Sequence, residues 1–318
     1  MKSALTLGVD IGGTKVMAGL VSPIGDVVST TCFPSGYELS VGQFIDRIST
    51  SVKHLQNVSG ATAVAIGVGA AGLIEKDSGI VVTSPNLKKW TGVPLKQILQ
   101  DAFNIPSFVT NDVRAAVFSE WHSGVGKDTN DLVCLFVGTG IGCGIITEGR
   151  LLSGKSGYAG ELGHTTIDVN GPLCRCGNRG CLESMAGGWG IASRAQKVVM
   201  LNPVIGAVML ELAHGKIEDI SAATVSQAFQ QNDPLATELM ECTAEYLAVG
   251  VKSIVNIFNP SKIILGGGVI EGTEKLIDMI RVHTTNALDT DVEIVKSRLG
   301  GNATVVGAAL MATATIKT

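Results

Sequence analysis

Apolar and polar residues along the first part of the chain follow the periods of short strands and of one amphipathic helix. Residues 5–33 form apolar runs separated by turn residues at 12–13 and 23–26, which predicts three strands with short connections. The next segment, residues 41–56, carries its apolar residues at helical spacing: Phe44, Ile48, Val52 and Leu55. The chain therefore begins with consecutive strands followed by a helix.

Strands and helices then alternate. Residues 62–69 form an apolar run that predicts a buried strand, and residues 94–103 predict a short helix with proline in its first turn. Residues 106–112 predict a strand that ends in two polar residues, and residues 113–122 predict the helix that follows it. This alternation is typical of an α/β fold.

A second block of strands and helices begins near residue 130. Residues 131–137 and 142–147 predict strands around a glycine turn, and residues 236–258 predict a long apolar helix. Residues 261–270 predict a strand that runs into three glycines, and residues 304–315 predict a helix of small residues.

The recurrence of the same motif classes in both halves predicts two α/β domains with a cleft between them. We expect the first domain to comprise residues 1–112 plus about 304–318, with the last helix folding back on it. The second domain would comprise residues 113–303.

Glycine is unusually frequent. The chain has 40 glycines among 318 residues, nearly twice the average share, and they follow no collagen-like period. The excess must therefore lie in turns, in tight packing or in ligand-binding loops. Hydrophobic residues make up 45% of the chain, which is ample for a packed core.

Charge and cysteine content narrow the class of protein. The formal net charge is -4 and there is no long basic run, so no nucleic-acid partner is expected. No apolar run reaches the roughly 18 residues that a membrane span needs. The seven cysteines follow no signal peptide, which indicates a reducing, cytoplasmic setting. A homodimer is the default expectation for oligomeric state.

Two glycine turns join predicted strands, at residues 10–15 and 138–144. Such turns expose backbone N–H groups on one concave side, where they bind phosphate oxygens. Thr14 and Thr139 add hydroxyl donors, and Lys15 adds a cation. Ordinary hairpin turns are the alternative. The dinucleotide fingerprint is excluded because strands, not helices, follow the turns, and no Walker sequence occurs.

Asn111 and Asp112 stand at the end of a predicted strand. A carboxylate on such a rigid element can orient a hydroxyl group and accept its proton during phosphoryl transfer. The alternative for Asp112 is capping of the following helix.

Three cysteines and one histidine cluster in the sequence: Cys174, Cys176, Cys181 and His164. Three thiolates and one imidazole form a common ligand set for structural zinc, and a site closed by four protein ligands leaves no position for catalysis. Reduced cysteines beside a core histidine are the alternative.

The order of these motifs resembles the actin-like ATPase and hexokinase superfamily, and within it the ROK family of repressors and sugar kinases. The resemblance rests on the acidic–Gly–Gly–Thr turn at 10–14, the Gly-Thr-Gly turn at 138–140 and the glycines at 266–268. The family signature CxCGxxGCxE also matches residues 174–183 without a gap. The resemblance covers essentially the whole chain and implies two actin-like ATPase (ribonuclease H-like) domains.

The resemblance implies phosphorylation of a hexose at its 6-hydroxyl, with ATP, Mg²⁺ and structural Zn²⁺ as cofactors. Asp112 would be the general base, and Asp10 would position Mg²⁺ through water. The implied nucleotide-binding residues are Asp10, Gly12, Gly13, Thr14, Lys15, Gly138, Thr139, Gly140, Gly142, Gly266 and Gly267. The implied sugar-binding residues are Asn86, Asn111, Asp112, Glu161, His164 and Glu183.

Two positions bear on the substrate and on the surroundings of the base. Some N-acetylmannosamine kinases of the family have histidine where this chain has Glu161, which favours glucose. Many members read NDxNAA where this chain has Arg114 in place of the second asparagine. N-acetylmannosamine and N-acetylglucosamine remain alternative acceptors, and polyphosphate remains an alternative donor.

Two non-enzymatic alternatives are also considered. A sugar-sensing regulator of the family would carry a DNA-binding domain before the kinase-like core, for which we expect no room because Asp10 stands near the start of the chain. A non-catalytic sugar-binding module is disfavoured by the presence of Asp10, Asp112 and both glycine turns.

Overall fold

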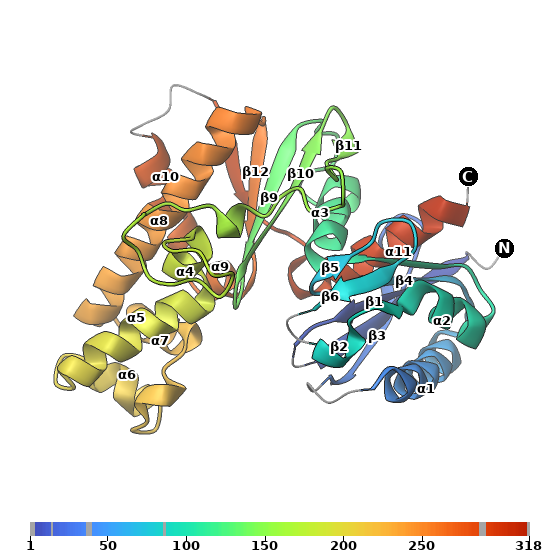
Figure 1. Ribbon diagram of the computed structural model, residues 1–318, viewed down its shortest axis with the longest axis horizontal. Coiled ribbons are helices and arrows are strands. Elements are labelled where there is room, and N and C mark those ends of the chain that lie inside the picture. Colours follow the sequence, from blue (N-terminus) through green and yellow to red (C-terminus); the bar gives the residue numbers. More distant parts are fainter. Residues whose placement is uncertain (1–3, 14, 36–39, 85–86, 286–290, 317–318) are drawn as a thin grey trace. The chain divides into compact units, whose positions relative to one another are not determined.

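The computed structural model describes residues 4–13, 15–35, 40–84, 87–285 and 291–316. The chain forms two compact units (Figure 1). Unit 1 consists of residues 1–128, 149–159 and 301–318, and unit 2 consists of residues 129–148 and 160–300. The domain limits proposed from the sequence stay a prediction.

A five-stranded sheet organises unit 1, in the order β3-β2-β1-β4-β8. The first three strands, β1 (Leu5–Ile11), β2 (Lys15–Val21) and β3 (Val27–Pro34), form an antiparallel meander, as the turn residues predicted. β1 also pairs in parallel with β4 (Ala63–Ala70), and β4 with β8 (Ser107–Asn111). The carboxyl ends of β1, β4 and β8 therefore lie at the same edge of the sheet.

Helices cover both faces of this sheet. Figure 1 shows α1 (Val41–Ser59) and α2 (Leu95–Phe103) on one face, and α3 (Asp112–Ser123) and α11 (Ala303–Ile316) on the other. Ser40 and Gln43 form a capping box that starts α1, and Gly60 ends it in the left-handed conformation. The predicted helices at 41–56, 94–103, 113–122 and 304–315 are confirmed, although α3 begins at Asp112.

The core under α1 and α2 contains residues of alternate strand positions, as the period of two requires. Leu7 and Val9 of β1 belong to it, together with Phe44 of α1 and Trp90. The rings of Phe44 and Trp90 meet edge to face with centroids 5.0 Å apart. A small sheet lies at the rim of this unit, formed by β5 (Leu73–Ile74), β6 (Ile80–Thr83) and β7 (Val93–Pro94). The short 3-10 helix η1 (Lys88–Trp90) precedes β7.

The opposite face of β1 and β4 lies directly against the backbone of α11. A Cβ atom on Gly8 would stand 1.9 Å from the carbonyl oxygen of Val305, and one on Gly67 would stand 1.8 Å from that of Ala308. A Cβ on Gly307 of α11 would likewise stand 1.7 Å from the carbonyl oxygen of Ala115 in α3. Part of the glycine excess is thus explained by helix–sheet and helix–helix packing without side chains between the backbones.

Unit 2 repeats the meander-then-parallel pattern. Its strands β10, β9, β12 and β13 are neighbours in one sheet, in this order. β9 (Leu132–Val137) pairs antiparallel with β10 (Ile141–Thr147) and parallel with β12 (Lys262–Gly266), which pairs parallel with β13 (Glu293–Lys296). The short strand β11 (Arg150–Leu151) belongs to unit 1. The predicted strands on both sides of the 138–140 turn are confirmed.

The longest helix of unit 2 is α8 (Pro234–Phe258), which confirms the predicted apolar helix. Asp233 caps its start and Pro234 occupies its first turn. The other helices are α4 (Leu182–Ala186), α5 (Gly188–Leu201), α6 (Ala207–Leu212), α7 (Ala222–Gln230), α9 (Gly268–Glu271) and α10 (Leu276–Thr285). Three 3-10 helices complete the list: η2 (Leu162–His164) and η3 (Ile217–Asp219) in unit 2, and η4 (Gly300–Asn302) before α11.

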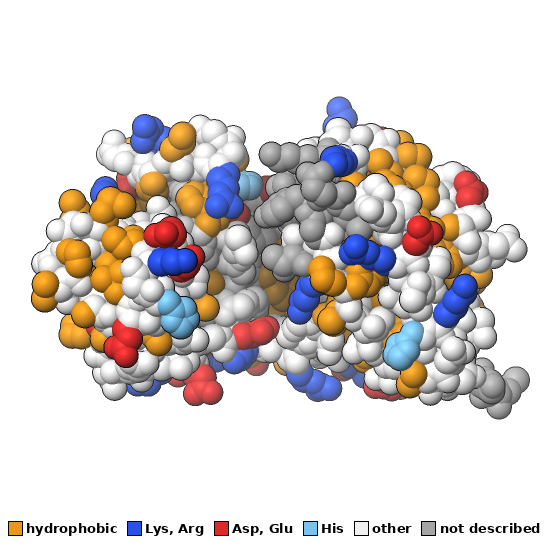
Figure 2. Space-filling view, turned by 90° about the horizontal axis from the view of Figure 1, so that it is seen from below, with side chains coloured by type: hydrophobic (Ala, Val, Ile, Leu, Met, Phe, Trp, Pro, Cys, Tyr) orange, Lys and Arg blue, Asp and Glu red, His pale blue; other side chains and the backbone are white. Residues whose placement is uncertain are grey.

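The surface mixes charges of both signs. Figure 2 shows acidic and basic side chains interspersed with apolar and uncharged polar ones on the visible face of each unit. Among the described residues, no helix combines the length and the apolar character that crossing a membrane requires.

The contact of Gly307 with α3 gives a stability prediction. Gly307→Ala should lower the free energy of unfolding by about 2–4 kcal/mol, because its methyl group would overlap the Ala115 carbonyl oxygen and force α11 away from α3. Urea denaturation followed by circular dichroism measures the change. Gly301→Ala is the matched control, since nothing lies within 4 Å of a Cβ at that position. Equal stability of the two variants would contradict the packing described here.

Candidate functional site

Asp10 lies near the carboxyl end of β1, on the face of the sheet that α11 covers. Thr6, Gly8 and Asp10 share this face because side chains alternate along a strand, and the Thr6 hydroxyl contacts the Thr313 hydroxyl of α11 at 2.8 Å. In register, Asp10 stands between Met17 of β2 and Gly69 of β4.

The turn after Asp10 closes tightly. The Gly12 N–H donates to the Lys15 carbonyl at 3.0 Å, which joins β1 to β2. Gly13 lies inside this turn, and Lys15 begins β2 with an exposed side chain. The predicted phosphate ligand Thr14 lies outside the described residues, as does the predicted sugar ligand Asn86.

Asn111, and not Asp112, caps α3. The Asn111 Oδ1 accepts the Arg114 N–H at 3.1 Å, and its Nδ2 donates to the Gly72 carbonyl at 3.1 Å. The capping alternative considered for Asp112 therefore applies to its neighbour. Asp112 is the first residue of α3, and its Oδ1 accepts the N–H of Val113 at 2.9 Å.

The structure brings Asp10, Lys15 and Asp112 close enough to interact electrostatically. The pKa of Asp10 is raised from 3.8 to about 7, mainly by burial and next by the Asp112 carboxylate, while the Lys15 ammonium opposes the shift. Gly69 makes this proximity possible, because a Cβ there would lie 3.3 Å from the Asp112 Cα and 2.5 Å from the Thr304 methyl group. Two carboxylates at one sheet edge favour a bound cation, which would stabilise their ionised forms.

Arg114, which stands where the family pattern has asparagine, has a definite structural role. Its guanidinium donates to the Leu152 carbonyl at 3.0 Å and to the Ser153 hydroxyl at 2.7 Å. Burial lowers the pKa of this guanidinium from its usual value. Arg114 therefore ties the segment 149–159 of unit 1 to the start of α3, next to Asp112.

In unit 2, the glycine turn between β9 and β10 is stabilised by hydrogen bonds within the turn and from the start of α5. Its own Gly138 N–H donates to the Gly140 carbonyl at 2.9 Å. The first amides of α5 also donate to it, Gly188 to the Gly138 carbonyl at 2.9 Å and Trp189 to the Thr139 carbonyl at 3.0 Å. The amides of Thr139 and Gly140 have no acceptor in the described part of the chain, so the turn offers them to an anion.

The carboxylate of Glu183 lies against the same turn. Its Oε2 accepts the Ile141 N–H at 2.9 Å and would stand 2.4 Å from a Cβ on Gly140. Its Oε1 accepts the indole N–H of Trp189 at 3.1 Å. Position 140 is therefore glycine because any side chain there would overlap the Glu183 carboxylate. Gly142 lies inside β10, where it pairs with Phe136.

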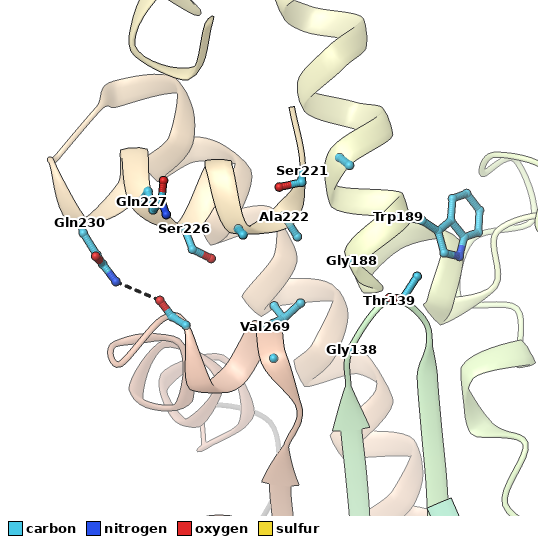
Figure 3. Close-up of a pocket in the computed structure, with 14 residues that line it drawn as sticks. Gly138, Thr139, Gly188, Trp189, Ser221, Ala222, Ser226, Gln227, Gln230 and Val269 are labelled. Atoms are coloured by element: carbon cyan, nitrogen blue, oxygen red, sulfur yellow. Dashed lines mark hydrogen bonds between the residues drawn. The ribbon is translucent and has the colours of Figure 1, made fainter. Parts of the chain in front are cut away.

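A cavity of ≈ 630 Å³ opens beside this turn, a size suited to a small organic ligand (Figure 3). Its described lining carries no charged side chain. The lining residues are Gly138, Thr139, Gly188, Trp189, Ala192, Ser221, Ala222, Ala223, Ser226, Gln227, Gln230, Gly268, Val269 and Gly272. A neutral ring with hydrogen-bonding edges fits such a lining, and an attached anion could reach the turn amides.

Most residues that line this cavity were not predicted from the sequence. Ser226, Gln227 and Gln230 of α7 line it opposite the turn, and the Gln230 amide donates to the Gly272 carbonyl at 3.0 Å (Figure 3). Of the three late glycines, Gly268 lines the cavity. Gly266 ends β12, and Gly267 has φ +91° and lies against the Val137 backbone. The glycines at 187 and 188, which start α5 against the turn, are the sequence signal that could have indicated this wall.

The four predicted metal ligands come together. One ligand atom from each of His164, Cys174, Cys176 and Cys181 lies within 4.8 Å of all the others. The Cys176 and Cys181 sulfurs are 3.6 Å apart, and Cys174 Sγ lies 3.7 Å from His164 Nδ1. Ligands at about 2.3 Å from a tetrahedral zinc ion are separated by roughly 3.7 Å. The donor set and its spacing therefore fit Zn²⁺.

Glu161 immediately precedes η2, the turn that carries His164. The Glu161 side chain is exposed. The thiol pKa of Cys143 in β10 is raised to about 12, mainly by burial and next by the negative charge of Glu161. Both predicted glutamates of the sugar site thus belong to unit 2, and Asn111 and Asp112 belong to unit 1.

Comparisons with known proteins agree with these features. The sequence profile of the ROK family matches residues 6–315. The chain is 33% identical over 313 residues to a glucokinase from Streptomyces coelicolor, covering 97% of each protein. It is also 33% identical to a xylose repressor from Caldicellulosiruptor bescii, covering 96% of this chain and 77% of the repressor.

Solved structures show the same fold. A ROK family glucokinase from Streptomyces griseus, crystallised with glucose and AMPPNP, superposes with a TM-score of 0.86 at 34% identity. The match covers 98% of this chain and 100% of the other. The predicted fold class, two actin-like ATPase domains, is thereby confirmed.

The raised pKa of Asp10 predicts a pH-dependent stability. Without Mg²⁺ and nucleotide, Asp10 is ionised in both folded and unfolded chains above about pH 7, and its burial then destabilises the fold. This cost shrinks as the pH falls from about 7 towards 4, where the folded form is protonated. Asp10→Asn should therefore raise the free energy of unfolding more at pH 8 than at pH 5, by on the order of 2–3 kcal/mol.

Urea titrations of the metal-free proteins at both pH values measure this difference. Asp77→Asn, which removes an exposed carboxylate, controls for net charge. A gain in Asp10→Asn that is the same at pH 5 and pH 8 would contradict the shift.

Proposed function

This chain belongs to the ROK family, and we propose that it is a sugar kinase that transfers the γ-phosphoryl group of ATP to the 6-hydroxyl of glucose. The observation that carries the proposal is the pair Asp10 and Asp112, whose carboxylates interact at one edge of the unit 1 sheet. The similarity to a glucokinase crystallised with glucose and an ATP analogue supports the same reaction.

Unit 2 would bind the nucleotide. The uncharged cavity between α7 and α5 would take the adenosine, and the free amides of Thr139 and Gly140 would bind phosphate oxygens. The hydroxyl of Thr139 adds a donor at the same turn. These groups stabilise negative charge without a counter-charge that would have to be desolvated.

Asp10 would hold Mg²⁺ through water, and Mg²⁺ when bound would neutralise charge on the phosphates. The turn at 12–15 would add backbone amides and the Lys15 ammonium near the same phosphates. Because the pKa of Asp10 is raised to about 7, Mg²⁺ and a proton would compete for the Asp10 carboxylate near neutral pH.

Asp112 would act as the general base. The sugar hydroxyl would donate its proton to the Asp112 carboxylate while its oxygen attacks the γ-phosphorus, and ADP would leave. Because Asn111 caps α3 and also binds Gly72, the backbone at this position is held rigidly. A fixed carboxylate loses little entropy in orienting the hydroxyl.

The sugar ring would be bound by Asn86, Asn111, Glu161, His164 and Glu183. The Glu183 carboxylate already accepts hydrogen bonds from Ile141 and Trp189, so its contact with a hydroxyl would use a remaining lone pair. Glu161 stands where some N-acetylmannosamine kinases have histidine, which favours glucose over N-acetylmannosamine. N-acetylmannosamine and N-acetylglucosamine are the alternative acceptors.

The cysteine cluster would hold a structural Zn²⁺ through His164, Cys174, Cys176 and Cys181. The loop that carries these residues is poor in regular structure, with isolated bridges only at Thr166–Cys181 and Leu173–Arg179 among its described residues. A bound metal would therefore fix His164 and the start of α4, which carries Glu183. No disulfide bond joins the described cysteines, and the reducing cytoplasm is the setting proposed for this chain.

A regulator without catalysis is the second candidate, since xylose repressors resemble this chain as closely as one of the glucokinases does. The electrostatically interacting pair of Asp10 and Asp112 supports the kinase instead, because a protein that only senses a sugar needs no such pair of carboxylates.

An ADP-release assay with ATP and Mg²⁺ tests the proposal against glucose, mannose, N-acetylmannosamine, N-acetylglucosamine and fructose. We expect turnover with glucose to exceed that with each other sugar. Turnover with N-acetylmannosamine alone would replace the substrate but keep the reaction. Absence of turnover with every sugar, in a chain that still binds one of them, would favour the regulator.

Asp112→Asn should lower kcat by about 10²–10⁴-fold, because the variant keeps the shape of the side chain but cannot accept the hydroxyl proton. Steady-state kinetics should show little change in the KM for ATP. Asp101→Asn, which alters an exposed carboxylate on α2, is the control and should leave kcat unchanged. Near-normal phosphorylation by Asp112→Asn would contradict the assignment of the base.

Cys181→Ser should abolish the zinc content of the purified chain, measured by atomic absorption, and should lower the melting temperature by several degrees. Cys242→Ser removes a thiol outside the cluster and should keep one zinc ion per chain. Full zinc occupancy in Cys181→Ser would exclude the four-ligand site.

A further inference from the structure

The conformation of the Gly138–Gly140 turn is stabilised by residues outside the proposed phosphate-binding amides. Backbone amides of Gly188 and Trp189 fix two of its carbonyl groups, and the Glu183 carboxylate fixes the Ile141 amide that follows it. A rotation of the turn would break all of these hydrogen bonds together. The orientation of the free Thr139 and Gly140 amides therefore depends on the position of Glu183 and on the start of α5.

Trp189 contacts this arrangement twice. Its backbone N–H donates to the Thr139 carbonyl at 3.0 Å, and its indole N–H donates to Glu183 Oε1 at 3.1 Å. Figure 3 shows Trp189 at the start of α5, beside Thr139. The second contact is charge-assisted and fixes the carboxylate on the side away from Ile141.

One side chain of the cysteine loop, residues 164–181, lies over the same indole ring. Arg175, between the metal ligands Cys174 and Cys176, places its guanidinium carbon 4.8 Å from the ring centroid of Trp189. This distance is typical of a cation–π contact. A continuous chain of contacts thus runs from the cysteine loop through Arg175, Trp189 and Glu183 to the turn.

We propose that Trp189 is a positioning residue for the phosphate-binding turn, and that Arg175 connects it to the cysteine loop. The inference rests on the proposed function, because it takes the turn as the site of nucleotide phosphates. Glu183 then has two roles, since the carboxylate proposed to contact the sugar also orients the donors for the phosphates. The cysteine loop would influence nucleotide affinity as well as local stability.

Trp189→Phe tests the hydrogen bond alone, because phenylalanine keeps an aromatic ring for Arg175 but has no N–H. Calorimetric titration should show an increase in the Kd for ADP of about 5- to 20-fold. The Kd for adenosine should stay unchanged, since adenosine has no phosphate to contact the turn. This difference separates positioning of the turn from loss of cavity wall.

A double-variant cycle tests the route through Glu183. If Trp189 acts through this carboxylate, Trp189→Phe should add little to the loss of ADP affinity already caused by Glu183→Gln. Full additivity of the two losses would overturn that route.

Arg175→Ala tests the connection to the cysteine loop and should raise the Kd for ADP by about 2- to 5-fold at unchanged zinc content. Arg179→Ala is the matched control, since Arg179 lies in the same loop but its guanidinium donates to the Gly171 carbonyl at 3.4 Å. Equal effects of the two substitutions would overturn the role of Arg175.

The outcomes separate the inference from the proposed function. A native chain that binds no ADP overturns both. If the native chain binds ADP and Trp189→Phe binds it equally well, the inference alone is overturned. The same holds if Trp189→Phe loses as much affinity for adenosine as it loses for ADP.

Discussion

Backbone lies directly against backbone at the points on which both units depend. In unit 1, α11 can lie on β1 and β4 only because Gly8 and Gly67 have no side chains, and Gly307 brings it against α3. In unit 2, a Cβ on Gly188 would stand 2.7 Å from the Gly138 carbonyl oxygen. Within unit 1 such contacts fix the local backbone at the sheet edge, and within unit 2 they fix the backbone of the glycine turn. Part of the glycine excess is therefore explained by close backbone packing within each unit.

That packing sets the chemistry. Gly69 allows the start of α3 to approach β4, so Asp112 lies near Asp10 and contributes to its raised pKa. The carbonyl groups of the 138–140 turn accept hydrogen bonds within unit 2, whereas the amides of Thr139 and Gly140 can donate to an anion. A coupled pair of carboxylates and a preformed set of N–H donors are what phosphoryl transfer requires, because catalysis of this reaction consists largely of positioning and of stabilising charge.

Local patterns allowed the strands, the long helix and the metal ligands to be predicted, because each depends on periodicity or on spacing within a short segment. The strands around both glycine turns and helix α8 followed from apolar runs, and the cysteines gather as their spacing indicated. Contacts between distant segments could not be predicted. The cavity lining from α7, the contact of Asn111 with Gly72 and the contact of Glu183 with the turn all depend on tertiary packing that one sequence does not encode locally.

If this chain phosphorylates a hexose at the 6-hydroxyl, the new phosphate ester must be at carbon 6 of the sugar. Glucose labelled with ¹³C and incubated with ATP, Mg²⁺ and the native chain can be followed by ¹H–³¹P correlation NMR. We expect a new phosphomonoester whose phosphorus is coupled to the two protons on carbon 6. Coupling to the proton on carbon 1, or no phosphomonoester of any of the sugars that the chain binds, would contradict it.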